Sequence, residues 1–266
     1  MKKNVKKRRV SGRINVSTVA GAWVFYFLAA VMPILFLLVT AFGVFGVDLQ
    51  GDIINSLPKE FKGAVAAAFA AAENATKGVT LFFIITVFIS GSQFLSQMKK
   101  DGEYIYGVSS DKGGLIKRIW AVAAIGVMFA VFLAIALFFS FERYLSRKIF
   151  GESGTVLITV AAFTAVITVC FFLNAMLNAF ASPVKVAFSH AALGSVVSLG
   201  VIVLGTIAFI IYLRLFDPYD PFYGSLTTAI VALFWTYIIM LGLVLGVVTT
   251  KSAYFRATDG KRVRRR

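Results

Sequence analysis

The residue types that perform hydrolytic chemistry are scarce in this chain. Such chemistry needs paired carboxylates, a nucleophile with a base, or a metal cluster. The 12 Asp and Glu residues form no metal-binding motif, and the one close outer pair, Asp217 and Asp220, is flanked by prolines that favour a turn over an ion site. His190 and Cys170 are the single His and Cys, and neither a phosphate-binding loop nor a dinucleotide motif is present. We therefore expect no catalytic residue, no metal, no cofactor and no enzymatic activity.

The polar side chains in the middle of the apolar stretches are neutral, so the sequence offers no intramembrane carboxylate relay. Asn174 and Asn178 lie one helical turn apart and are the pair that we would test first. Neutral polar groups of this kind also form hydrogen bonds between helices, and that alternative stays open. The candidate substrate-binding residues are Pro33, Ser92, Asn174, Asn178, Trp235 and Tyr237.

Glycines recur at spacings that let helices approach closely. Gly242 and Gly246 form a GxxxG step, and Gly194 stands four residues before a serine. In lipid, small residues of this kind favour close helix packing. We assign helix packing to Gly194, Gly224, Gly242 and Gly246. An interface between two copies of the chain would show the same glycine pattern, and that alternative stays open.

A basic segment from Lys99 to Arg118 is the most polar inner feature, and we expect it to form a cytoplasmic loop. Tyr104 and Tyr106 are interleaved with its cations, a combination that suits anionic lipid headgroups at a membrane surface. An ordinary positively charged inner loop is the alternative. The candidate headgroup residues are Lys99, Lys100, Lys117 and Arg118.

The elements that must position these residues are six apolar stretches. Of 266 residues 59% are hydrophobic and 15% are charged, a balance that excludes a water-soluble enzyme and indicates an integral membrane protein. Each stretch is long enough to span a bilayer as a helix. The expected spans are 19–47, 79–98, 119–141, 155–177, 191–213 and 226–249. The fold class expected is therefore an all-α bundle of six transmembrane helices, with Pro33 tilting or kinking the first.

The basic residues predict the orientation of this bundle. With both ends on one side, that side holds 20 Lys and Arg and the other side 7, which places both termini in the cytoplasm. Basic tails at 1–18 and 250–266 then flank one membrane domain at 19–249, with a short outer-loop helix at about 57–73. The net charge of +15 follows from this distribution, so we expect no nucleic-acid partner, although binding of RNA or acidic lipid by the tails is an alternative.

Four segments resemble the YihY/BrkB family of bacterial inner-membrane proteins, once labelled ribonuclease BN-like. They are Tyr26–Pro33, Ser56–Pro58, Ser90–Gly107 with Lys117-Arg118, and Tyr223–Leu226 continuing through Leu233–Tyr237 to Gly246. The resemblance covers about residues 19–250 in span order and loop lengths. Departures are Ala30 in place of a serine, Glu103 in place of an asparagine, and Val247 and Val248 in place of the family's Ala-Glu after Gly246.

The resemblance implies a role in envelope integrity, and members of the family have been connected with movement of lipid or lipopolysaccharide. From this and from the uncharged spans, we expect a multi-pass protein of the bacterial cytoplasmic membrane that moves or positions a lipid-like amphiphile. Membrane lipids are the expected partners, anionic headgroups among them, and a homo-oligomer is an open option. A channel for a small neutral solute and a scaffold for another envelope factor are the alternatives. The residues give no support to the ribonuclease label.

Overall fold

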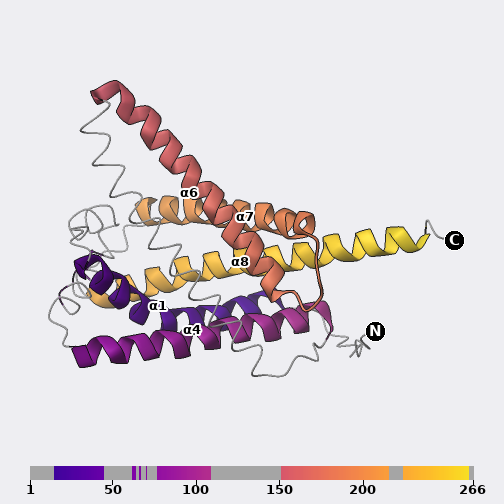
Figure 1. Cartoon of the computed structure of the whole chain (residues 1–266), viewed down its shortest axis with the longest axis horizontal. Coiled ribbons are helices and arrows are strands. Elements are labelled where there is room, and N and C mark those ends of the chain that lie inside the picture. Colours follow the sequence, from indigo (N-terminus) through magenta and orange to yellow (C-terminus); the bar gives the residue numbers. More distant parts are fainter. Residues whose placement is uncertain are drawn as a thin grey trace. The chain divides into compact units, whose positions relative to one another are not determined.

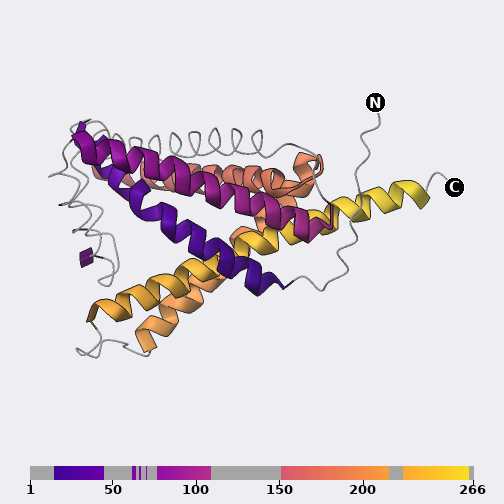
Figure 2. The ribbon, with the colours of Figure 1, turned by 90° about the horizontal axis from the view of Figure 1, so that it is seen from below.

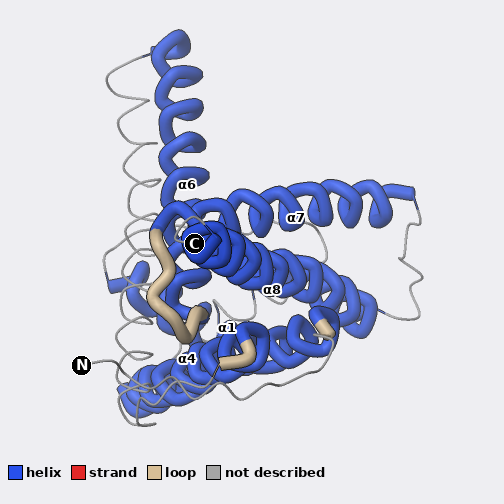
Figure 3. Tube along the Cα trace, turned by 90° about the vertical axis from the view of Figure 1, so that its right-hand side faces the viewer, coloured by secondary structure: helices blue, strands red, loops and turns tan. Residues whose placement is uncertain are grey.

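In the computed structural model, the described residues are 15–44, 62–63, 66, 70, 77–108, 151–215 and 224–263. Within these ranges the regular structure is entirely α-helical, and short loops complete the trace (Figures 1 and 3). The helices with full bounds are α1 (Val16–Val44), α4 (Lys77–Tyr106), α6 (Gly151–Ala181), α7 (Phe188–Leu215) and α8 (Gly224–Val263). The all-helical class expected from the sequence is therefore confirmed for the described part of the chain.

Four of the six expected spans lie within these helices, the first lies within α1 as far as Val44, and the third, 119–141, lies outside the described residues. Four helical segments are long and apolar enough to cross a membrane: Leu81–Tyr106, Thr164–Ala181, Phe188–Leu215 and Ile230–Thr258. The described apolar part of α1, Val16–Ala30, is shorter. Of the expected outer helix at 57–73, residues 62, 63, 66 and 70 are described, and they are helical. The count of six and the orientation of both ends stay predictions.

Local signals in the sequence set two helix ends. Asn15 precedes α1, and its side-chain Oδ1 accepts a hydrogen bond from the Thr18 N–H at 3.3 Å, a typical N-cap. At the other end of α4, Gly107 takes a positive φ of 67°. The Gly107 N–H then donates to the Tyr104 carbonyl and the Val108 N–H to the Glu103 carbonyl. This pair of bonds is the Schellman cap, which satisfies the last carbonyls of α4.

Two helices extend past their expected ends. From its composition we expect an inner loop from Lys99 onward, but α4 continues to Tyr106. It passes through Gly102, which packs against the Ala181 backbone, and ends only at Gly107, which takes a positive φ. Likewise α8 continues from the expected boundary at 249 to Val263. Lys99 and Lys100 therefore lie on the last turns of a helix rather than in a loop. Lys117 and Arg118 lie outside the described residues.

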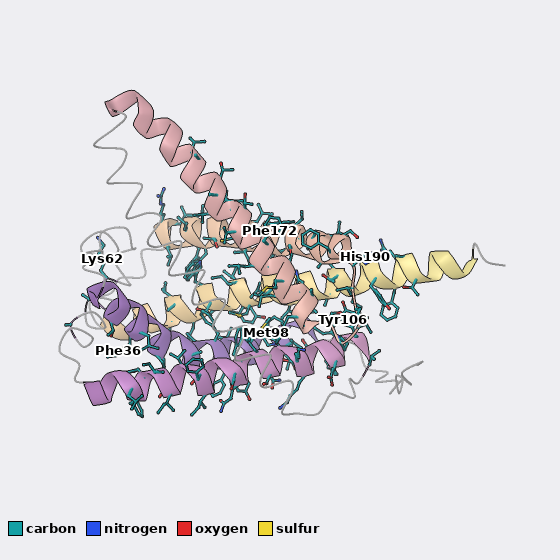
Figure 4. The ribbon with its side chains drawn as sticks, in the orientation of Figure 1. Phe36, Lys62, Met98, Tyr106, Phe172 and His190 are labelled. Atoms are coloured by element: carbon teal, nitrogen blue, oxygen red, sulfur yellow. The ribbon has the colours of Figure 1, made fainter. Side chains whose placement is uncertain are left out.

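The chain divides into two compact units. Unit 1 comprises Met1–Phe27, Gln93–Arg118 and Phe171–Arg266, and unit 2 comprises Leu28–Ser92 and Ile119–Cys170. In unit 2, the rings of Phe36 on α1 and Phe83 on α4 stack with centroids 3.8 Å apart (Figure 4 labels Phe36). In unit 1, α7 and α8 lie side by side and run in opposite directions (Figures 1 and 2). The largest fully buried side chains include Trp23, Leu95, Met98, Ile105, Met240, Val244 and Val247.

Candidate functional site

The expected pair Asn174 and Asn178 lies buried in unit 1, between α6 and α7. The Asn178 Nδ2 donates to Asn174 Oδ1 at 3.0 Å and to Ser195 Oγ at 3.2 Å. The Asn174 Nδ2 donates to Ser198 Oγ at 2.9 Å. Asn178, Ser195 and Ser198 are at most 1% exposed, and Asn174 is 5% exposed. These four residues are called the polar cluster below, and each of them finds its partner on the same or a neighbouring helix.

Glycines bring α8 against the polar cluster. A Cβ atom on Gly194 would contact the Thr250 hydroxyl and lie 2.5 Å from the Gly246 carbonyl oxygen. A Cβ on Gly246 would lie 3.0 Å from Asn178 Oδ1. Gly242 is similarly close to the Ser198 carbonyl, at 3.1 Å from a Cβ in its place. We infer that these glycines serve the close packing of α7 on α8, while Gly224 is the first residue of α8.

Two further candidates in unit 1, Trp235 and Tyr237, form hydrogen bonds with other residues than those of the polar cluster. Trp235 is 38% exposed, and its Nε1 donates to Thr206 Oγ1 at 3.4 Å on α7. The Tyr237 hydroxyl shares a hydrogen bond of 2.8 Å with Ser17 on α1. Pro33 and Ser92 belong to unit 2. The structure thus joins the two asparagines, and substrate binding by all six candidates stays a prediction.

A carboxylate network on α1 and α4 was missed at the sequence level. The Trp23 Nε1 donates to Asp101 Oδ2 at 2.8 Å, and the Gln97 Nε2 donates to Oδ1 and Oδ2 at 3.0 and 3.1 Å. Trp23 is fully buried, whereas Asp101 is partly exposed. These three residues are called the Asp101 network below. The spacing of Gln97 and Asp101, four residues apart on one helix, is the signal that could have indicated it.

Cations gather around the same end of α4. The Lys251 Nζ donates to the Ile105 carbonyl at 2.7 Å, which adds a positive group to the negative end of the helix. The Lys99 Nζ lies 4.6 Å from the centre of the Phe180 ring, a cation–π contact. Lys100 is exposed. Two of the four predicted headgroup residues therefore lie at one end of unit 1, and their binding of headgroups stays a prediction.

Aromatic side chains pack against one another at this end of unit 1. Tyr254 lies edge-on to His190, with centroids 6.3 Å apart, and Phe255 lies 6.3 Å from Tyr106. Tyr106 and His190 are labelled in Figure 4. The His190 Nδ1 is buried without a hydrogen-bond partner among the described atoms. Unlike the polar cluster, this end of unit 1 therefore contains hydrogen-bonding capacity that the described residues do not use.

No three His, Cys, Asp or Glu residues in the described ranges lie together as metal ligands would. Cys170 is exposed and has no disulfide partner. Since part of the chain lies outside these ranges, the expectation of a protein without a metal stays a prediction.

Long apolar helices with polar groups held between them define an integral membrane protein. The model of the family described as Virulence factor BrkB matches residues 9–265, so the chain belongs to this family. The resemblance to YihY/BrkB proteins is thereby confirmed.

Curated relatives agree with this assignment. A "UPF0761 membrane protein" of Vibrio atlanticus (strain LGP32) is 24% identical over 253 residues, which cover 91% of this chain and 79% of the relative. The corresponding protein of Vibrio vulnificus (strain YJ016) is 25% identical over 247 residues, covering 90% and 77%. One of Vibrio campbellii (strain ATCC BAA-1116) is 22% identical over 253 residues, covering 92% and 79%. No solved structure matches the chain.

Proposed function

We propose that this BrkB-family protein is a non-enzymatic protein of the bacterial cytoplasmic membrane that moves or positions a lipid-like amphiphile and so maintains the cell envelope. Its six helices would hold both termini in the cytoplasm, and its partners would be membrane lipids rather than nucleic acid. The variants Lys59→Cys and Gly260→Cys, each in a Cys170→Ala background, test this orientation. An impermeant thiol reagent should label the first in intact cells and the second only after lysis.

One observation carries the proposal: in unit 1 an apolar helix surface begins beside a cationic end. On α7 the buried residues are the small side chains near its start, whereas large apolar ones such as Leu204 and Ile211 are 69% and 51% exposed. The start of α7 lies next to α8 through the His190–Tyr254 contact, and Lys251 on α8 reaches α4. An apolar surface that continues into a polar, positive end fits the two halves of an amphiphile.

The experiment is a lipid-scrambling assay on the full chain in liposomes. A phospholipid with a fluorescent group is bleached from outside, and protein-catalysed exchange is expected to expose the inner-leaflet fraction. The double variant Lys99→Gln/Lys100→Gln should slow this exchange about tenfold to thirtyfold, since two basic groups near the surface contribute about 1 kcal/mol each toward anionic lipid. Lys185→Gln, an exposed cation on the α6–α7 connection, is the matched control. Exchange no faster than in empty liposomes contradicts the proposal, and solute flux in the same liposomes would favour a channel instead.

A scaffold is the second candidate, and the length of α8 favours it. This helix continues to Val263 through the basic C-terminal segment, so it presents that segment on an ordered element. Removal of residues 256–266 distinguishes the two functions. A lipid-moving protein should keep its scrambling activity in liposomes after this truncation. A scaffold should lose its effect on envelope permeability in cells.

A further inference from the structure

The Asp101 network has the hydrogen-bonding pattern of an ionised carboxylate. All three bonds come from N–H groups of Trp23 and Gln97, which donate at these atoms and cannot accept. A protonated carboxyl would need an acceptor for its O–H, and none of these three bonds supplies one. The charge is therefore held in place by neutral groups of α1 and α4.

This negative charge has no counter-ion among the described residues. The cation whose field acts on Asp101 is Lys100, its neighbour in sequence, but no ion pair joins them. Lys251 uses its Nζ on the Ile105 carbonyl instead. The C-terminal end of α4 adds further negative potential at this level. A partly buried carboxylate in such a field favours a cation from outside the chain.

The position of Asp101 and its unused hydrogen-bonding capacity indicate which kind of cation would bind. An ionised carboxylate accepts about four hydrogen bonds, and three are taken here. Trp23 bonds to Asp101, and Tyr104 and Tyr106 follow it on the last turns of α4; such rings prefer the headgroup region of a membrane. Six residues further on, Gly107 ends the helix. The open acceptor therefore lies where lipid headgroups lie, next to the exposed ammonium of Lys100.

We propose that Asp101 binds the primary ammonium group of a zwitterionic aminophospholipid, with Lys100 facing its phosphate. The proposal rests on the proposed function for the idea that the ligand is a lipid, and it names the headgroup. A primary ammonium offers N–H donors to the free carboxylate direction. A quaternary ammonium has none, so the site should distinguish ethanolamine from choline headgroups of equal net charge.

The test measures which phospholipids the purified full-length protein retains from vesicles. The vesicles contain equal amounts of phosphatidylethanolamine, phosphatidylcholine and phosphatidylglycerol with the same acyl chains, and retained lipid is counted by mass spectrometry. The wild type should enrich ethanolamine over choline lipid about fivefold to tenfold, the effect of one hydrogen bond between charged groups at a partly exposed site. Asp101→Asn should bring this ratio to about one, and Glu103→Gln, on the same turn of α4, should leave it unchanged.

Equal retention of ethanolamine and choline lipids by the wild type overturns the proposal. So does an unchanged preference in Asp101→Asn, or an equal loss in Glu103→Gln. The wild-type comparison needs no variant, so it decides the matter even if Asp101→Asn does not fold. If the wild type scrambles lipid without headgroup preference, the Asp101 site fails and the proposed function survives. If it retains ethanolamine lipid but scrambles none, the site survives and lipid movement fails.

Discussion

The polar cluster and the Asp101 network both place polar side chains between helices of unit 1, but they differ in how completely those groups are satisfied. Asn174 and Asn178 are neutral, almost fully buried, and bonded to each other and to Ser195 and Ser198. Asp101 is charged, partly exposed, and bonded only to neutral donors. A neutral group that is satisfied inside the bundle contributes to packing, whereas a charge held by neutral donors still favours a counter-charge.

The largest expected effect comes from placing a charge in the polar cluster. Asn178→Asp replaces an NH₂ group that donates to Asn174 and Ser195 by an acceptor, and it buries an unpaired carboxylate. We expect a loss of about 3–5 kcal/mol in the free energy of unfolding, measured in mixed detergent micelles. Asn15→Asp is the control, since both residues cap helices equally well at this exposed position. Equal stability of the two variants would show that the cluster is open to water.

Filling the contact between α7 and α8 should have the next largest effect. Gly194→Val forces side-chain atoms toward Thr250 and the Gly246 carbonyl. We expect a loss of about 1–3 kcal/mol in the same unfolding measurement, the usual cost of overpacking. Gly200→Val on the same helix is the matched control, because a Cβ there meets nothing within 4 Å. A control variant that is as unstable as Gly194→Val would mean that helix propensity, and not packing, sets the cost.

Asp101→Asn reverses the chemistry of Asn178→Asp and should lower the free energy of unfolding much less. Asp101→Asn keeps an oxygen for the Trp23 N–H, and the lost charge-assisted bonds are offset by relief of the cost of holding a charge away from water. We expect a change within about 1 kcal/mol in either direction in the unfolding measurement. A loss as large as that of Asn178→Asp would mean that both regions are equally closed, and the contrast between them would disappear.

The smallest expected effect is the coupling of one pair in the polar cluster. A double-mutant cycle with Asn174→Ala and Ser198→Ala isolates the bond between Asn174 Nδ2 and Ser198 Oγ. We expect a coupling of about 0.6 kcal/mol, the average for hydrogen bonds between helices in a membrane. The cycle is completed by four unfolding measurements. Coupling indistinguishable from zero would remove this bond from the account of helix packing.

Much of the helical architecture could be predicted because long apolar stretches leave a chain in lipid with few options. Residues 155–177, 191–213 and 226–249 all lie within observed helices. The ends were less predictable. The residues after Met98, Gly102 among them, resemble a loop in composition, yet α4 continues through them, and Gly107 is the residue whose positive φ ends it.

The candidate site was predictable where its partners are local. The spacing of Asn174 and Asn178 indicates one helical face, and their hydrogen bond follows from it. Their contacts with Ser195 and Ser198 depend on how α6 and α7 are rotated against each other, which periodicity does not specify. The Trp23–Asp101 bond joins residues 78 positions apart, and Asp101 lies in a segment that composition alone assigns to a loop. Local spacing therefore indicates the bond between Gln97 and Asp101 but not the bond from Trp23.

The continuity of α8 has a mechanical consequence. Its 40 residues extend about 60 Å at the usual rise of an α-helix, twice the roughly 30 Å of a bilayer's hydrocarbon core. Between Gly246 and Gly260 the helix contains neither glycine nor proline to act as a hinge. A force applied to its basic end is therefore transmitted along the helix to Gly246 and to Asn178, which packs against it. Binding of a partner to this end of α8 would therefore displace residues in the interior of the bundle.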